Sequence, residues 1–247
     1  MWENISPERS RSFIERHFDP NIKDTSVTYA KPAITISRAE GAGGLTVASH
    51  LAEYLQKHTA SHEVWTVFSH HLVAKVLEDH NQQKHIANFM KEDHKGTLTD
   101  AFEEFLGLHP STWTLVEQTN ATILRLAQTG NVILVGRGAN IVTNELETAF
   151  HVRLVGSFEK RIEQAQKVLG LDEKSAIDYI KKKDKKRRRY LKDNFDKDID
   201  DPLLYHVLIN TDLVQYDEAA RLIGNEVIIR FSLGSPVKAT GSKHRLA

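Results

Sequence analysis

The chain has 247 residues with 33 basic and 33 acidic side chains, so its formal net charge is zero and a uniformly basic nucleic-acid-binding surface is not expected. A hydrophobic fraction of 40% supports a large core, and the absence of cysteine excludes disulfides, thiolate metal sites and a cysteine nucleophile. No apolar run approaches the roughly 18 residues of a membrane span, and the N-terminus lacks the apolar core of a signal peptide. We therefore expect a cytoplasmic protein with no membrane partner.

Residues 1–30 are predicted to form an N-terminal extension. A helix start near Pro7 is followed by Phe13 and Phe18, which would lie on one apolar face of a short helix. We expect this segment to dock on the core or on a partner, and a disordered arm is the alternative.

A β-rich run at 33–37 leads into a glycine-rich turn and then into a helical pattern with apolar residues four positions apart. A strand, a glycine turn and a helix in this order are typical of a phosphate-binding loop, whose backbone N–H groups and helix N-terminus attract anions. The predicted phosphate-binding residues are Gly41, Ala42, Gly43, Gly44, Leu45 and Thr46.

The match to the loop pattern GxxxxGK[ST] is incomplete. Arg38 stands at the first glycine, Gly43 at the second, and Gly44 where the lysine is expected. The cation that reaches the β- and γ-phosphates is therefore missing from its usual place. An ordinary strand-to-helix turn is the alternative interpretation.

Strands and helices alternate along the rest of the chain. Uninterrupted apolar runs such as 132–135 are typical of strands buried on both faces of a parallel sheet. Besides 33–37, strands are predicted at 64–68, 132–135, 151–155 and 205–209, with 227–231 as a further candidate. Helices are predicted at 69–77, in a polar insertion reaching about residue 107, from Pro110 to Gly130, from Ser157 onward and at 216–223.

This alternation predicts an α/β fold with a parallel, doubly wound, five-stranded sheet, followed by a mobile tail at 232–247. Ligands of such sheets bind at the carboxyl ends of the strands. Arg38, the glycine turn and Arg137 all follow predicted strands, so three distant elements are expected to converge on one anion.

The stretch from Lys181 to Arg189 holds eight basic residues and one acid, and an acidic segment follows it. A solvated helical face explains most of these charges. A nucleic-acid patch is disfavoured because few aromatic residues are interleaved. The third interpretation is a lid, at about 170–200, that is mobile without ligand and carries one or two arginines onto phosphates.

Neither a metal site nor a serine nucleophile is supported by the sequence. The 13 histidines show no ligand spacing backed by carboxylates, so no metal-binding residues are predicted, and no GxSxG motif is present.

Several segments together resemble the cytidylate kinase-like family of P-loop proteins over about residues 31–224. The segments are ITISRAEGAGG at 34–44, VILVGRGAN at 132–140, HVRLVGSFEKRI at 151–162, KKDKKRRRY at 182–190 and DDPLLYHVLINTD at 200–212. The resemblance implies a P-loop fold in a domain at 31–231, and transfer of a phosphoryl group from ATP, with magnesium, to a nucleoside monophosphate.

The resemblance also implies roles for particular residues. Arg38 and Arg187 match catalytic arginines, whereas Arg137 and Arg161 match arginines that hold the acceptor. Gly44 stands where the loop pattern has a lysine, and Leu45 stands where relatives often carry an arginine. Neither supplies a charge, so whether the chain is an enzyme stays open. The alternative is a non-catalytic nucleotide- or phosphate-binding protein on the same fold. A nucleotide is the expected partner, nucleic acid is not, and a homo-oligomer is compatible with the sequence.

Overall fold

A computed structural model describes residues 12–13, 31–59, 64–69 and 112–234. The predicted helix at 69–77, the polar insertion and most of the C-terminal tail lie outside these residues.

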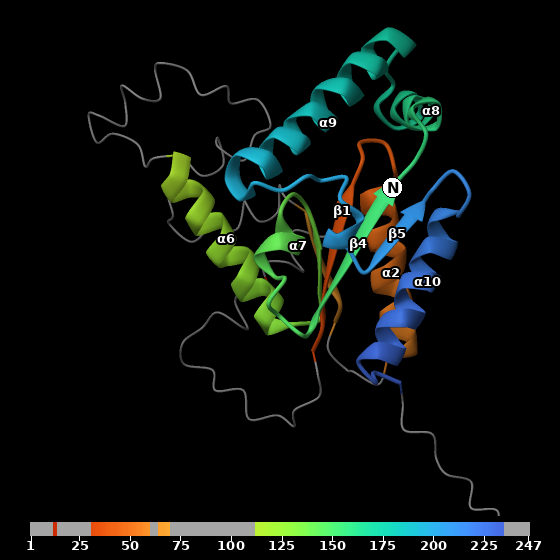
Figure 1. The fold of residues 1–247 in the computed structure, drawn as a ribbon. Helices are drawn as coiled ribbons and strands as arrows, with labels where there is room; N and C mark the ends of the chain where they lie inside the picture. The colour runs from red at the N-terminus through yellow and green to blue at the C-terminus, as the bar shows by residue number, and fades with distance from the viewer. Residues whose placement is uncertain (1–11, 14–30, 60–63, 70–111, 235–247) are drawn as a thin grey trace, which may run out of the picture.

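The core of the molecule is a five-stranded parallel sheet with the strand order β2-β3-β1-β4-β5 (Figure 1). This confirms the predicted fold class. The five strands lie within a few residues of their predicted positions: β1 Ala33–Arg38, β2 Thr66–Ser69, β3 Val132–Val135, β4 Ala149–Val155 and β5 Val207–Asn210.

Helices cover both faces of the sheet and make a three-layer arrangement (Figure 1). On one face, α2 (Gly44–His58) and α10 (Tyr216–Arg230) enclose a core with the apolar side chains of β1 and β4. On the other face, α6 (Thr112–Thr129) and α7 (Ala139–Val142) pack with β2 and β3. Among the described helices, none is long and apolar enough to cross a membrane.

The predicted sixth strand at 227–231 is wrong, because α10 continues as a helix to Arg230. The β-branched run Val227-Ile228-Ile229 favoured a strand. However, Ala219, Ile223 and Val227 are spaced by four and are all buried against the core, whereas Ile229 is 74% exposed. The burial of residues at helical spacing therefore outweighed the preference of β-branched residues for a strand.

Two further helices lie beyond the carboxyl ends of the strands (Figure 1). The first, α8 (Phe158–Leu169), is capped by Ser157, whose hydroxyl accepts a hydrogen bond from the backbone N–H of Lys160. The second, α9 (Glu173–Phe195), contains the whole basic segment in one continuous helix. A short 3-10 helix, η1 (Pro202–Leu204), then leads into β5.

One residue of the N-terminal extension is seen on the core. Phe13 is 9% exposed and its ring meets that of Phe68 edge-on, with centroids 5.6 Å apart. At this residue, the expected docking of the extension on the core is observed.

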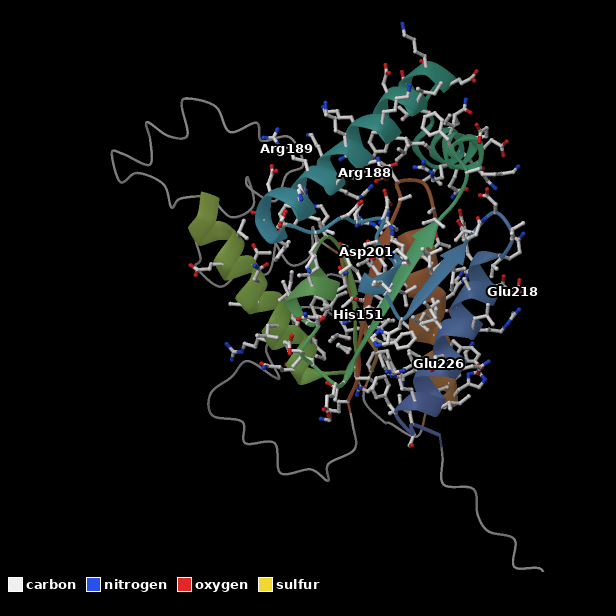
Figure 2. All side chains as sticks on the ribbon, viewed as in Figure 1. His151, Arg188, Arg189, Asp201, Glu218 and Glu226 are labelled. Carbon is white, nitrogen blue, oxygen red and sulfur yellow. The ribbon has the colours of Figure 1, made fainter. Side chains whose placement is uncertain are left out.

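The face of β4 that points away from α2 and α10 is polar. His151 is 6% exposed, and its Nδ1 lies 2.9 Å from the hydroxyl oxygen of Thr35 on β1. Its backbone N–H donates to Nδ1 of His206. Burial, with a smaller contribution from His206, lowers the pKa of His151 from 6.5 to about 4. Figure 2 shows His151 inside the domain, and it is neutral there at neutral pH.

The close contact between α2 and α10 depends on the lack of a side chain at Gly224. A Cβ there would lie 2.4 Å from the ring of Tyr54. We therefore expect Gly224→Val to lower the free energy of unfolding by about 1–3 kcal/mol, measured by denaturant titration. Leu222→Val is the matched control, because Leu222 is 51% exposed on the same helix. Equal losses in the two variants would contradict this account of the contact.

The burial of His151 predicts that stability falls with acid. The unfolded chain takes up a proton near pH 6.5 and the folded chain only near pH 4, so the unfolded state binds more protons between these values. Stability should drop by up to about 3 kcal/mol as the pH falls through this window. In His151→Asn, which keeps a polar group near Thr35, denaturant titrations should show this drop removed. If the free energy of unfolding falls by the same amount with pH in the wild type and in His151→Asn, the prediction is wrong.

Candidate functional site

The N-terminus of α2 has no internal partner for its first backbone N–H groups. Gly43 caps the helix in a left-handed conformation, without a side-chain cap and without an acidic residue in the first turn. The backbone N–H groups of Gly43, Gly44, Leu45 and Thr46 donate to no other described residue. Four unsatisfied donors at a helix N-terminus form a site for an anion.

The glycines of this loop are required by its neighbours as well as by its shape. Gly41 and Gly43 have φ values of 82° and 75°. A Cβ on Gly41 would lie 2.6 Å from the carbonyl oxygen of Arg161, and one on Gly43 would lie 2.3 Å from the ring of Tyr216. The loop is therefore held between α8 and α10 in one conformation, with its amides already in place for a ligand.

Arg38, the last residue of β1, lies across the position of the missing lysine. A Cβ on Gly44 would meet Cγ of Arg38 at 2.9 Å, so the arginine stem fills the space where a lysine side chain would begin. Arg38 makes no hydrogen bond or ion pair with any described residue. Burial and the charge of Arg187 lower the pKa of Arg38 to about 9, with Glu40 acting in the opposite direction. Among the described residues, Glu40 is therefore the acid whose charge acts on Arg38, and it does so without forming an ion pair.

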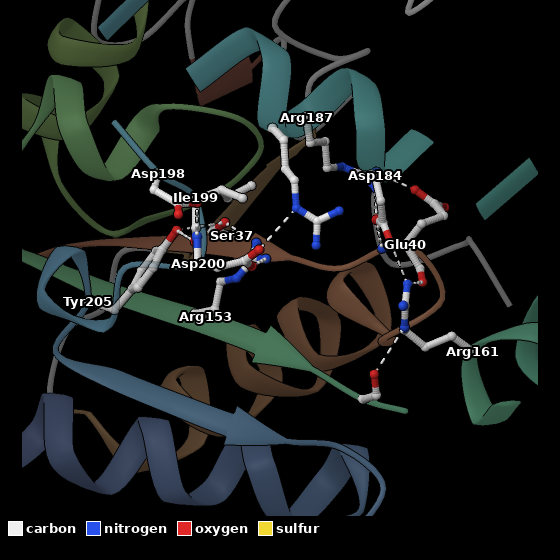
Figure 3. Close-up of polar contacts among 12 residues, drawn as sticks. Ser37, Glu40, Arg153, Arg161, Asp184, Arg187, Asp198, Ile199, Asp200 and Tyr205 are labelled. Atoms are coloured by element: carbon white, nitrogen blue, oxygen red, sulfur yellow. Dashed lines mark hydrogen bonds and ion pairs between the residues drawn. The ribbon is translucent and has the colours of Figure 1, made fainter. Parts of the chain in front are cut away.

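The lid helix α9 is joined to the glycine loop by two carboxylates (Figure 3). Arg187, whose side chain is 4% exposed, forms an ion pair with Glu40 of the loop. Asp184 accepts hydrogen bonds from the backbone N–H of Glu40 at 2.8 Å and from Nη1 of Arg161 at 2.6 Å. Arg161 also donates to the carbonyl oxygen of Glu40 at 3.1 Å. Two cations of this site, Arg161 and Arg187, are therefore paired with carboxylates of the protein itself.

Most of the basic segment is a solvated helical face, as one sequence interpretation had it. Lys181, Lys182, Lys185, Arg188 and Arg189 are exposed. Arg189 pairs with Asp193 one turn further along the helix, at 2.9 Å. Arg187, in contrast, is buried. The segment therefore combines a solvated face with a single deeply inserted arginine, which is the arrangement the lid interpretation requires.

Arg137 follows β3, and its guanidinium lies 4.6 Å from the ring centroid of Tyr190 on α9. Burial lowers the pKa of Arg137, Tyr190 opposes this effect, and the charge of Arg187 adds to it. Arg137 also contributes to the lowered pKa of Arg38. Arg38 and Arg187 line one cavity, whereas Arg137 lines a separate one together with Tyr190. The charges of Arg137 and Arg187 both act on the pKa of Arg38.

The backbone N–H groups at the loop are hydrogen-bond donors, so they suit an anion such as a phosphate and not a metal ion. No group of three or more histidine or acidic side chains with metal-binding geometry occurs within the described residues. Glu40 and Asp184 are both engaged by arginines. The Thr46 side chain stands in the first turn of α2, where a hydroxyl can reach a magnesium ion held by phosphates.

Sequence reasoning selected the arginines of this site and missed their counterions. Glu40 and Asp184 were not among the candidate residues, although a single acid within a run of eight basic residues was a usable signal. Arg153 of β4 was missed as well. It stands in an otherwise apolar part of a buried strand, and that position was its signal.

Comparisons with known proteins agree with the observed fold. A profile of the cytidylate kinase-like family matches residues 33–213. No curated protein sequence gives a significant match. The chain is similar to the crystal structure of an uncharacterized protein from Eubacterium ventriosum ATCC 27560, with 20% identity, a TM-score of 0.58 and coverage of 80% of this chain and 98% of that chain.

Two solved kinases are more distant in structure. Shikimate kinase from Acinetobacter baumannii, in complex with shikimate, has 18% identity and a TM-score of 0.44, with 81% of this chain and 93% of that chain covered. A gluconokinase from Sinorhizobium meliloti 1021 has 11% identity and a TM-score of 0.42, with 83% and 94% covered.

The contact between the lid and the loop can be tested at Asp184. Asp184→Asn removes the charge that faces Arg161 and Arg187. It should lower the free energy of unfolding by about 2–4 kcal/mol, because Arg161 loses its carboxylate partner and Arg187 keeps only Glu40. Asp193→Asn is the matched control on the same helix, where the pair with Arg189 is exposed and should matter by less than about 1 kcal/mol. Equal effects in denaturant titrations would mean that Asp184 does not hold the lid.

Proposed function

The chain belongs to the cytidylate kinase-like family, and from this premise we propose that it transfers a phosphoryl group from ATP to a nucleoside monophosphate. Family membership supports phosphoryl transfer in general. The observation that carries the proposal is that the aliphatic stem of Arg38 packs at Gly44, beside four backbone N–H groups that have no acceptor among the described residues. Phosphoryl transfer depends on positioned positive charge, and this arrangement supplies it where the lysine is absent.

In this proposal the α2 amides bind the donor's phosphates and Arg38 faces the β- and γ-phosphates. Arg137, at the end of β3, binds the acceptor's phosphate. An oxygen of that phosphate attacks the γ-phosphorus, the bond to the bridging oxygen breaks, and ADP leaves with the electron pair. Magnesium bound with ATP would supply further positive charge to the same phosphates, and the hydroxyl of Thr46, in the first turn of α2, would be a candidate ligand for it.

The lid, about residues 170–200, has to exchange partners during this reaction. Arg187 is paired with Glu40 and Asp184 in the structure, so it reaches the transferring group only by leaving these carboxylates for phosphate oxygens. This exchange replaces one anion by another around a buried cation, and it avoids exposing the guanidinium unpaired.

A non-catalytic nucleotide-binding protein is the second candidate. The observation that favours it is the pairing of Arg161 and Arg187 with carboxylates of the protein itself. If these pairs persist when nucleotide is bound, the site holds a phosphate chain but does not stabilise its transfer.

A coupled assay of ADP formation with CMP, dCMP, UMP and AMP separates the two candidates. A kinase shows turnover above background with at least one acceptor, and a binding protein shows none with any of them. In a kinase, Arg137→Ala should raise KM for the monophosphate roughly tenfold or more. Arg187→Ala should mainly lower kcat, by roughly 100-fold or more. Arg189→Ala, on the solvated face of α9, is the control and should behave as wild type.

A charge swap tests whether Arg38 replaces the lysine. Gly44→Lys alone should impair the protein, because the new side chain collides with the stem of Arg38. Arg38→Gly should lower kcat by roughly 100-fold. The double variant Arg38→Gly with Gly44→Lys restores a cation to the loop and should recover part of that loss. A double variant no more active than Arg38→Gly would contradict the assignment.

A further inference from the structure

A second polar cluster surrounds Arg153 and lines the same cavity as Arg38. This arginine is in β4, where its neighbours Val152 and Leu154 are fully buried in the apolar core. Its own side chain is 5% exposed. A buried guanidinium is costly unless it is paired and hydrogen-bonded, so its partners indicate why it is there.

The partners satisfy only part of Arg153. Its Nη1 donates to the hydroxyl of Ser37 at 3.0 Å, and its Nη2 donates to Oδ1 of Asp200 at 2.9 Å (Figure 3). Its Nε is buried and has no acceptor. Asp200 is also shared with Arg188, which donates to Oδ2 at 3.0 Å. One half-exposed carboxylate therefore serves two guanidinium groups.

Arg153 lines a cavity of about 150 Å³ between the carboxyl ends of β1 and β4 and the lid helix α9. Five arginines and two aspartates line it: Arg38, Arg153, Arg161, Arg187 and Arg188, with Asp184 and Asp200. Even when Glu40, the partner of Arg187, is included, three carboxylates face five guanidinium groups. The excess of two positive charges matches a dianion.

We propose that this cavity binds a phosphate dianion through Arg153 and Arg38, and that Asp200 holds Arg153 in place until the anion arrives. Two guanidinium forks suit the oxygens of a tetrahedral phosphate, which can accept several hydrogen bonds at once. The site differs from the α2 amides, because Arg153 reaches it from β4 and none of the loop glycines lines it. The anion site itself does not rest on the proposed function. If that function holds, the anion is the acceptor's phosphate, which Arg153 then shares with Arg137, and Arg38 lies between this phosphate and the donor's phosphates.

Calorimetric titration with inorganic phosphate and with CMP tests the proposal on the full chain. Arg153→Gln should weaken phosphate binding roughly 10- to 100-fold, because it removes charged hydrogen bonds to the anion. Arg189→Gln, on the outer face of α9, is the control and should leave binding unchanged. Unchanged phosphate affinity in folded Arg153→Gln would overturn the proposal.

The variant Asp200→Asn distinguishes an anion site from a purely structural ion pair. It tests the proposal even if Arg153→Gln does not fold. Without the competing carboxylate, Arg153 is free to bind phosphate, so phosphate affinity should rise several-fold and added phosphate should restore thermal stability. If the pair is only structural, the variant loses stability and phosphate affinity stays the same or falls, which would overturn the proposal.

The two ligands distinguish the source of the phosphate. Tighter binding of CMP than of inorganic phosphate, with both dependent on Arg153, identifies the acceptor's phosphate, whereas equal affinities identify phosphate alone. If the wild-type protein binds phosphate through Arg153 but shows no kinase turnover, the anion site is supported and the proposed function is contradicted.

Discussion

The ion pair between Arg187 and Glu40, with the contacts that Asp184 makes to Arg161 and to the loop backbone, joins helix α9 to the glycine loop. Without these contacts, several guanidinium groups would face one another in a partly buried space. Such an arrangement is unstable unless anions are interleaved. The protein supplies Glu40, Asp184 and Asp200 for this purpose, and the rest of the site is built around their positions.

This arrangement gives a physical account of how a loop without the usual lysine can hold phosphates. The backbone amides of α2 are fixed by glycines packed against Arg161 and Tyr216, so they need no rearrangement to receive an anion. On the proposed function, the positive charge would come from Arg38, whose stem occupies the space where a side chain on Gly44 would lie. Preorganised donors and charges of this kind are the main contribution that a protein makes to phosphoryl transfer.

The sequence predicted the sheet well because strands such as 132–135 are uninterrupted apolar runs between glycine-rich turns. It failed at 227–231, where a β-branched run lies on a helix whose buried face only tertiary packing reveals. Arg38, Arg137 and Arg187 were named as candidates because they follow strands or lie in a basic segment, and Arg161 was named from the family resemblance. Their counterions depend on how α9 lies across the loop, and Glu40 and Asp184 are 144 residues apart in the chain. No local pattern predicts such a pair.

Phosphorus NMR of the wild-type protein with ATP, magnesium and CMP tests the central claim most directly, because it follows the transferred group itself. The account predicts that ADP and CDP signals grow together and in equal amounts, and that in Arg38→Gln they grow at least roughly 100-fold more slowly. ADP formed without CDP, or equal rates in the wild type and Arg38→Gln, would contradict the claim that Arg38 supplies the charge for transfer to the monophosphate.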